Sequence, residues 1–207
     1  MLAEVRTGII QAFDGAVNPA RNDKTGALIV ADGHGKYVEA VLRGNVYFLS
    51  VAAAAPTAYV GAAGGTPLLA VHNPTGSNKN IAILLAAAAA RVVASATGHT
   101  VIELWAGVSV TPTGTQTTPK SALTFASGGV GLGFSNTVLT GSTALNLAWP
   151  LTSYFWGTTV GVSTSIAVAD LNGLIVLAPG MEVALGATVA PASLTWDAAL
   201  WWEELPA

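Results

Sequence analysis

Apolar side chains recur at every second position through most of the second half of the chain. In Val101–Val110 the series on one face is Ile102, Leu104, Ala106, Val108 and Val110, and the other face has Glu103, Trp105 and Ser109. The same alternation recurs in Leu145, Leu147 and Trp149; in Val162, Thr164, Ile166 and Val168; in Met181, Val183, Leu185, Ala187 and Val189; and in Leu194, Trp196, Ala198, Leu200 and Trp202. Strands repeat with a period of two, and Gly, Pro, Asn and Thr clusters separate these series. The pattern predicts an all-β fold, an antiparallel sandwich or barrel.

The first half of the chain contains further strand-like segments. Lys36–Leu42 and Asn45–Val51 flank Arg43-Gly44, and Pro67–His72 precedes the turn-rich loop Asn73–Asn80. Ile81–Ser95 is harder to interpret, because five consecutive alanines favour a helix whereas its isoleucines and valines favour a strand. We predict a long, fully buried strand there, and a helix is the alternative.

Three later segments are predicted to connect strands. Asp170-Leu-Asn-Gly173 has the composition of a turn. Thr111–Pro119 and Ser127–Thr143 are rich in Thr, Gly and Ser without a core pattern, which predicts long loops on the β scaffold.

The chain divides into two parts by charge. The first 43 residues carry ten charged side chains, whereas the 153 residues from Gly44 to Trp196 carry six. Charges, turn signals and short apolar pieces alternate in residues 1–35, which predicts an extended arm or loosely attached hairpin; an ordinary first pair of strands is the alternative. Residues 36–207 form the predicted body.

Only 9% of the whole chain is charged, against about 25% for a typical soluble domain. A freely diffusing monomer keeps charges of both signs on its surface for solubility. The neutral, alanine-rich body therefore suggests a structural part of an assembly. A net charge of -3 without clustered Lys and Arg gives no footprint for nucleic acid.

Several other classes find no support in the sequence. Without cysteine there is no disulfide, thiolate metal site or cysteine nucleophile. The first residues include Glu4 and no apolar core of leader length, so no secretory leader is expected. The longest fully apolar run, Ile81–Ala90, is about half of a helical membrane span, so membrane insertion is not expected.

No catalytic or cofactor motif is present. The histidines, His34, His72 and His99, are far apart in the sequence, and we expect turn or partly buried roles for them and no metal or cofactor. Glycoside hydrolysis needs two facing carboxylates, which nothing in the sequence places together, so a depolymerase is the least favoured class. We expect no enzymatic activity.

Aromatic residues gather in two places. One group surrounds Pro150 and includes Trp149, Tyr154 and Trp156, and the other, near the C-terminal end, includes Trp201 and Trp202. Large rings fill cores and subunit interfaces, which is the interpretation we favour; exposed rings that stack on a host glycan are the alternative.

Four short segments resemble small virion proteins of tailed bacteriophages: Gly35–Asn45, Asn73–Asn80, Leu177-Ala-Pro-Gly180 and Trp202-Glu-Glu-Leu-Pro206. These proteins decorate capsid heads as cement proteins, are β-sandwiches or jelly rolls, and are often trimeric. The resemblance implies a jelly-roll-like sandwich, a homotrimer, a location on the outer capsid surface after assembly in the host cytoplasm, and the major capsid protein as partner. It implies no catalytic residue.

The resulting hypothesis is a capsid decoration protein with a candidate interface at Trp149, Trp156, Trp201 and Trp202. In the arm, Arg6, Arg21 and Lys24 are predicted to pair with carboxylates on a capsid neighbour. The alternative is a receptor- or glycan-binding module of a phage tail or head fibre.

Overall fold

The structure is a computed structural model that describes residues 36–59, 65–91, 98–139, 147–156, 166–189 and 195–207. The chain divides into two units, Met1–Glu39 and Ala40–Ala207. The predicted arm, residues 1–35, lies outside the described residues.

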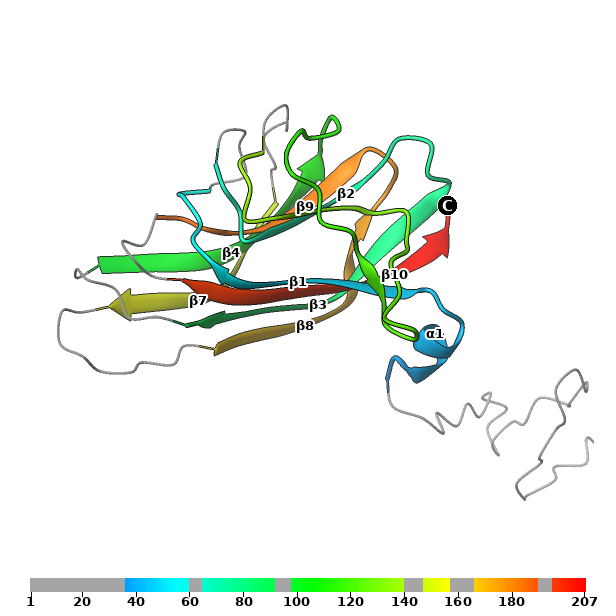
Figure 1. Cartoon of the computed structure of the whole chain (residues 1–207), viewed down its shortest axis with the longest axis horizontal. Coiled ribbons are helices and arrows are strands. Elements are labelled where there is room, and N and C mark those ends of the chain that lie inside the picture. The colour runs from blue at the N-terminus through cyan, green and yellow to red at the C-terminus, as the bar shows by residue number, and fades with distance from the viewer. Residues whose placement is uncertain (1–35, 60–64, 92–97, 140–146, 157–165, 190–194) are drawn as a thin grey trace, which may run out of the picture. The chain divides into compact units, whose positions relative to one another are not determined.

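The body consists of two five-stranded antiparallel sheets that pack as a sandwich (Figure 1), which confirms the all-β prediction. Sheet I has the order β5-β1-β10-β3-β8 and sheet II the order β6-β2-β9-β4-β7. In chain order the strands are β1 Val46–Ala54, β2 Leu69–Asn73, β3 Lys79–Ala90, β4 Gly98–Val108, β5 Lys120–Ser121, β6 Leu132–Ser135, β7 Leu147–Trp156, β8 Ile166–Leu177, β9 Met181–Ala187 and β10 Trp196–Pro206.

The strand order is that of a jelly roll. Without the short edge strands β5 and β6, the sheets read β1-β10-β3-β8 and β2-β9-β4-β7. The chain changes sheet at each step from β1 to β4 and again from β7 to β10, as in a fold of two Greek keys. The predicted jelly-roll-like sandwich is therefore confirmed.

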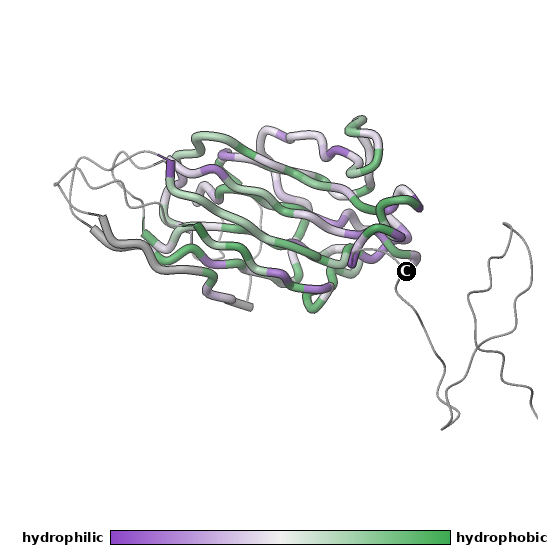
Figure 2. The backbone as a smooth tube through the Cα atoms, turned by 90° about the horizontal axis from the view of Figure 1, so that it is seen from below, coloured by the Kyte–Doolittle hydropathy of each residue, from purple (hydrophilic) through white to green (hydrophobic). Residues whose placement is uncertain are grey.

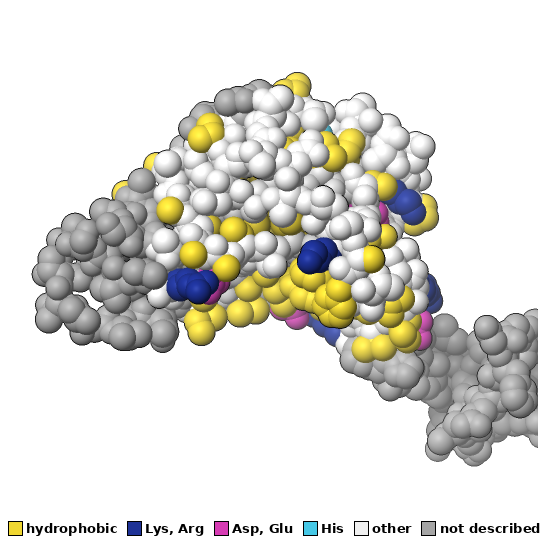
Figure 3. All heavy atoms as spheres, in the orientation of Figure 1, with side chains coloured by type: hydrophobic (Ala, Val, Ile, Leu, Met, Phe, Trp, Pro, Cys, Tyr) yellow, Lys and Arg dark blue, Asp and Glu magenta, His cyan; other side chains and the backbone are white. Residues whose placement is uncertain are grey.

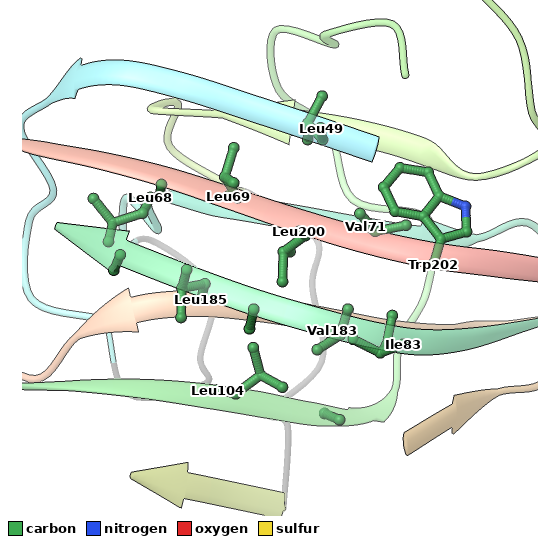
Figure 4. Packing of buried hydrophobic residues seen from close by; sticks show 14 of the residues in the cluster. Leu49, Leu68, Leu69, Val71, Ile83, Leu104, Val183, Leu185, Leu200 and Trp202 are labelled. Atoms are coloured by element: carbon green, nitrogen blue, oxygen red, sulfur yellow. The ribbon is translucent and has the colours of Figure 1, made fainter. Parts of the chain in front are cut away.

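The alternating series supply the core between the sheets. Trp196, Ala198, Leu200 and Trp202 of β10 are buried there. They meet leucines and valines of sheet II, including Leu104 and Leu185 (Figure 4). Apolar residues also dominate the strands along the rest of the body (Figure 2). The series in β4 leaves the core after Ala106, because Val108 lies at the end of the strand and is 70% exposed.

β3 confirms the strand interpretation of the segment that begins at Ile81. The prediction that it is fully buried is wrong in its second half. Ile81, Ile83, Ala86 and Ala88 lie in the core, whereas Leu85, Ala87 and Ala89 on the other face are only partly covered. The apolar run therefore has two different environments.

Lys36–Leu42 does not form a strand. Val38–Leu42 is a short α-helix, α1, which ends at Gly44 with a left-handed φ of 74°. The Gly44 N–H donates to the Val41 carbonyl and the Asn45 N–H to the Ala40 carbonyl, the pair of bonds that closes a Schellman motif. Arg43-Gly44 is thus a helix end, and β1 begins just after it.

Two other predictions are corrected. Asp170–Gly173 is a bulge inside β8: Leu85 pairs with Asp170 and Ile83 with Ile175, so the residues between them are extra. Asn172 and Gly173 adopt φ values of 54° and 75°, which glycine and asparagine tolerate in bulges as well as in turns. The predicted loop Ser127–Thr143 contains β6, whose four residues pair with β2.

Candidate assembly surface

The outer sides of the two sheets differ. The outer side of sheet II is covered by the chain itself: Tyr59, Phe134 and Leu139 are buried there. Tyr59 contacts Gly186 of β9 so closely that a Cβ at Gly186 would lie 2.7 Å from its ring. The outer side of sheet I, called the outer face below, exposes large apolar side chains.

Strand β8 contributes most of this exposed apolar surface. Ile166 is 69% exposed, Val168 63%, Leu174 67% and Val176 48%. Hydrophobic side chains gather along the lower side of the body in Figure 3, over the strands of sheet I in Figure 1. Of the described strands, only β3 pairs with β8, which is therefore an edge strand of the described sheet. An apolar edge strand is a site at which another chain can pair.

One end of the outer face is built from small residues. One row across the sheet is Ser50, Ala199, Ala87 and Val168, and the next contains Asp197, Ala89 and Ile166. A shallow groove of about 380 Å³ lies over these rows and is lined mainly by the alanines. The row of Ser50 has no charged side chain.

Charged groups stand at the margins of the outer face. The Asp197 carboxylate accepts a hydrogen bond from the Ala53 N–H at 2.9 Å and pairs with the Arg91 guanidinium at 3.1 Å. The Ala53 bond, with a smaller contribution from Arg91, lowers the pKa of Asp197 despite an opposing effect of burial. Ala53 lies in a bulge of β1 with φ 54°, so Asp197 also fixes the backbone at this end of the groove. Asp170 lies on β8 and Glu203 at the far end of β10.

Three aromatic rings rise next to the alanine rows. Phe48 stacks on Trp201 with ring centroids 4.8 Å apart, and Phe125 meets Phe48 edge-on at 6.0 Å. Phe125 is 66% exposed and has a left-handed φ of 57°, which is unusual for an aromatic residue. Its N–H donates to the Ser121 carbonyl at 2.9 Å, which closes the tight loop after β5. The loop thus holds an apolar ring in solvent in an unfavourable backbone conformation.

The buried polar side chains elsewhere serve the fold. Asn73 donates to the carbonyls of Lys79 and Leu177, both at 2.8 Å, and so ties two turns together. His72 is fully buried opposite Glu182 on the β2–β9 ladder, and neither of its ring nitrogens has a hydrogen-bond partner. Burial lowers the pKa of His72.

The described residues contain no group of three His, Asp or Glu side chains placed to hold a metal ion. Within the same residues, no helix has the length and apolar character to cross a membrane. The surface feature that stands out in this part of the chain is therefore the outer face.

Comparison of the chain with protein-family models, curated proteins and solved structures finds no match.

The predicted interface residues do not form one site. Trp201 lies on the outer face, and Trp149 is 37% exposed on β7 of the other sheet. Trp202 is a correction: it is fully buried in the core, since its position in the β10 alternation points it between the sheets. Trp156 ends β7, but the structure does not describe its side chain. Arg6, Arg21 and Lys24 lie outside the described residues.

The sequence reasoning missed the residues that define the outer face, above all Phe48, Phe125 and Val168. A signal was present in Ile81–Ala90, because a strand that is apolar on both faces is expected to be covered on both. The sandwich core covers one face of β3, and the described part of the chain leaves the other partly open.

Proposed function

We propose that this protein is a non-enzymatic structural subunit of a virion, a capsid decoration protein of the tailed-bacteriophage type that works as a homotrimer. The observation that carries the proposal is the outer face, with an alanine-lined groove and exposed apolar residues on β8 and in the loop after β5. Contiguous exposed apolar surface of this kind marks interaction sites.

Two further features support a structural role. Jelly rolls are frequent in viral shells, although lectins and cupins share the fold. Asn73, a buried polar residue, holds two turns together through its hydrogen bonds. The four segments that resemble phage virion proteins direct the proposal to phage heads.

The first test is the mass of the purified protein at micromolar concentration, by sedimentation equilibrium. The proposal expects the mass of three copies of the chain. The second test is co-sedimentation of the protein with capsids of the phage that carries its gene. We expect binding to the capsids to be saturable, and we expect the bound protein to protect the capsids against heat. A protein that is monomeric and stays in the supernatant when the capsids sediment would contradict the proposal.

The N-terminal segment is proposed to contribute to capsid attachment. Arg6, Arg21 and Lys24 give it positive charges, but exposed ion pairs contribute only about 0–1 kcal/mol each. Ordering along the partner and strand hydrogen bonds would therefore supply most of the attachment. Deletion of residues 1–30 is expected to keep the urea midpoint and the oligomer while weakening capsid binding. Loss of the folded body on deletion would show that the segment belongs to the core.

Glycan binding is the second candidate, and Trp149 is the observation that favours it. Its ring is 37% exposed on β7 and could stack on a sugar. Binding of the wild type to a glycan array, lost on Trp149→Ala with the oligomer unchanged, would support this function over capsid decoration.

A further inference from the structure

We propose that a second copy of this chain covers the outer face, with the rings around Phe125 of one copy seated in the alanine groove of the other. The inference rests on the proposed function, which requires assembly, and adds the surface through which copies meet. It is argued below from the size, the shape and the backbone of the outer face.

The outer face has the size that a stable contact between copies needs. The four long strands of sheet I contain nine to twelve residues each. With strands about 4.8 Å apart and about 3.3 Å per residue, the face measures about 19 Å by 36 Å, or about 700 Å². Two such faces together, about 1,400 Å², fall within the ~1,200–2,000 Å² buried in specific protein interfaces.

The shape of the outer face is complementary to itself. The ring row, Phe48 and Trp201, lies two residues along the strands from the groove row, Ser50 and Ala199, a distance of about 7 Å. A second copy can therefore place its rings in the groove of the first. A reciprocal contact closes as a pair, whereas a contact that runs in one direction forms a ring of copies if the rotation closes and an open filament if it does not.

The backbone at Phe125 points to a partner. Glycine would occupy its left-handed conformation without strain, yet the chain places there an aromatic ring that is 66% exposed. A residue held in an unfavourable conformation on a surface is a reason to look for a function. Insertion of the ring between two copies would bury it.

The charge distribution explains why the partner surface should be neutral. The row from Ser50 to Val168 has no charged side chain. Asp197 lines the groove in the next row, where it pairs with Arg91 at 3.1 Å, and Asp170 lies on the edge strand β8 in the row of the rings. Interface centres are depleted of charge and their rims are polar. A second copy of the same neutral row meets this requirement.

Two variants and a matched control test the proposal. Val168→Asp places a charge in the neutral row, and Phe125→Gly removes the ring while relieving its backbone. Val108→Asp is the control, because Val108 is as exposed as Val168 but lies on sheet II. Sedimentation equilibrium should give dissociation constants at least tenfold higher for the two variants than for the wild type, and an unchanged constant for the control.

Cysteine cross-linking tests the contact directly, because the wild-type chain has no cysteine. Copies with Phe125→Cys mixed with copies with Ala199→Cys should form disulfide-linked pairs. Copies with Val108→Cys, mixed with Ala199→Cys, should not.

Each outcome separates this inference from the proposed function. Oligomers that persist unchanged in both variants would overturn the outer-face contact and leave the structural subunit intact. Variant-sensitive dimers would support the contact and contradict the trimer. A monomeric wild type would overturn the inference. Cysteine cross-links that form at the outer face only after removal of residues 1–35 would also overturn it, since that segment would then cover the outer face.

Discussion

Glu204 is expected to be one of the positions in the body where substitution lowers the free energy of unfolding most. Its side chain is 4% exposed, and one oxygen accepts hydrogen bonds from three donors: the Val130 N–H at 2.7 Å, the Gly131 N–H at 3.3 Å and the Trp202 indole N–H at 3.4 Å. It thereby fastens the segment before β6 to β10. Glu204 also acts on Tyr47, whose pKa is raised by burial and, second, by the negative charge of Glu204.

Replacement of Glu204 by Ala removes the acceptor from all three donors. A hydrogen bond to a charged group contributes about 1.5–3 kcal/mol, and each buried donor left without an acceptor costs about 1–3 kcal/mol. Because two of the three bonds are long, we expect the free energy of unfolding to fall by about 3–5 kcal/mol. Glu204→Gln keeps an oxygen acceptor and should lose only about 1–2 kcal/mol.

Urea unfolding followed by tryptophan fluorescence measures this loss. Glu203→Ala is the matched control, because Glu203 is the preceding residue, points to the other side of β10 and is partly exposed. The control should change the unfolding free energy by less than about 0.5 kcal/mol. If Glu204→Ala and Glu203→Ala differ by less than about 1 kcal/mol, the three donors find other partners and the reasoning is refuted.

Three further predictions concern stability. Because burial lowers the pKa of His72, the unfolded chain takes up a proton at this residue at a higher pH than the folded chain does. The contribution of His72 to the free energy of unfolding should therefore be constant above pH ~6.5 and fall by up to about 1.4 kcal/mol per pH unit below it. Urea unfolding should show a smaller slope below pH ~6.5 in His72→Leu. Gly133→Ala should destabilise by about 1–3 kcal/mol, because its Cβ would lie 2.5 Å from the Thr117 carbonyl oxygen; an unchanged urea midpoint would contradict this. Ala53→Gly should relieve the φ of 54°, which should increase the free energy of unfolding by up to about 1 kcal/mol and raise the thermal midpoint. A lowered midpoint would show that no strain is stored at Ala53.

The period-two series predicted strands well because their alternation is set by the sandwich core. In β10, each second residue from Trp196 to Trp202 meets sheet II, so the sequence pattern and the packing coincide. The same rule failed at α1, where Lys36–Leu42 is too short for the periods of helix and strand to be distinguished, and the Schellman bonds decide the structure. It also failed at Asp170–Gly173, because residues that favour turns equally favour bulges.

The candidate surface was less predictable than the fold. Alternation tells which residues share a face, but it does not tell which face looks outward when both are apolar. Ile166 and Val168 belong to one series, yet the core side of β8 is formed there by Ala167, which lies between them, and by Ala169, which follows. The left-handed backbone conformation of Phe125 could not be predicted from the sequence, since nothing in the neighbouring residues requires it.

The place of β10 in sheet I has a consequence for the synthesis of the protein. This strand lies between β1 and β3, and pairs such as Val46–Glu203 join regions near opposite ends of the chain. On the ribosome, β1 and β3 emerge long before the strand that separates them, and until then their edges are open to pairing with one another or with nascent neighbours. Such distant pairings make folding slow. We therefore expect yield and folding to depend strongly on slow, chaperone-assisted expression and on an intact β10.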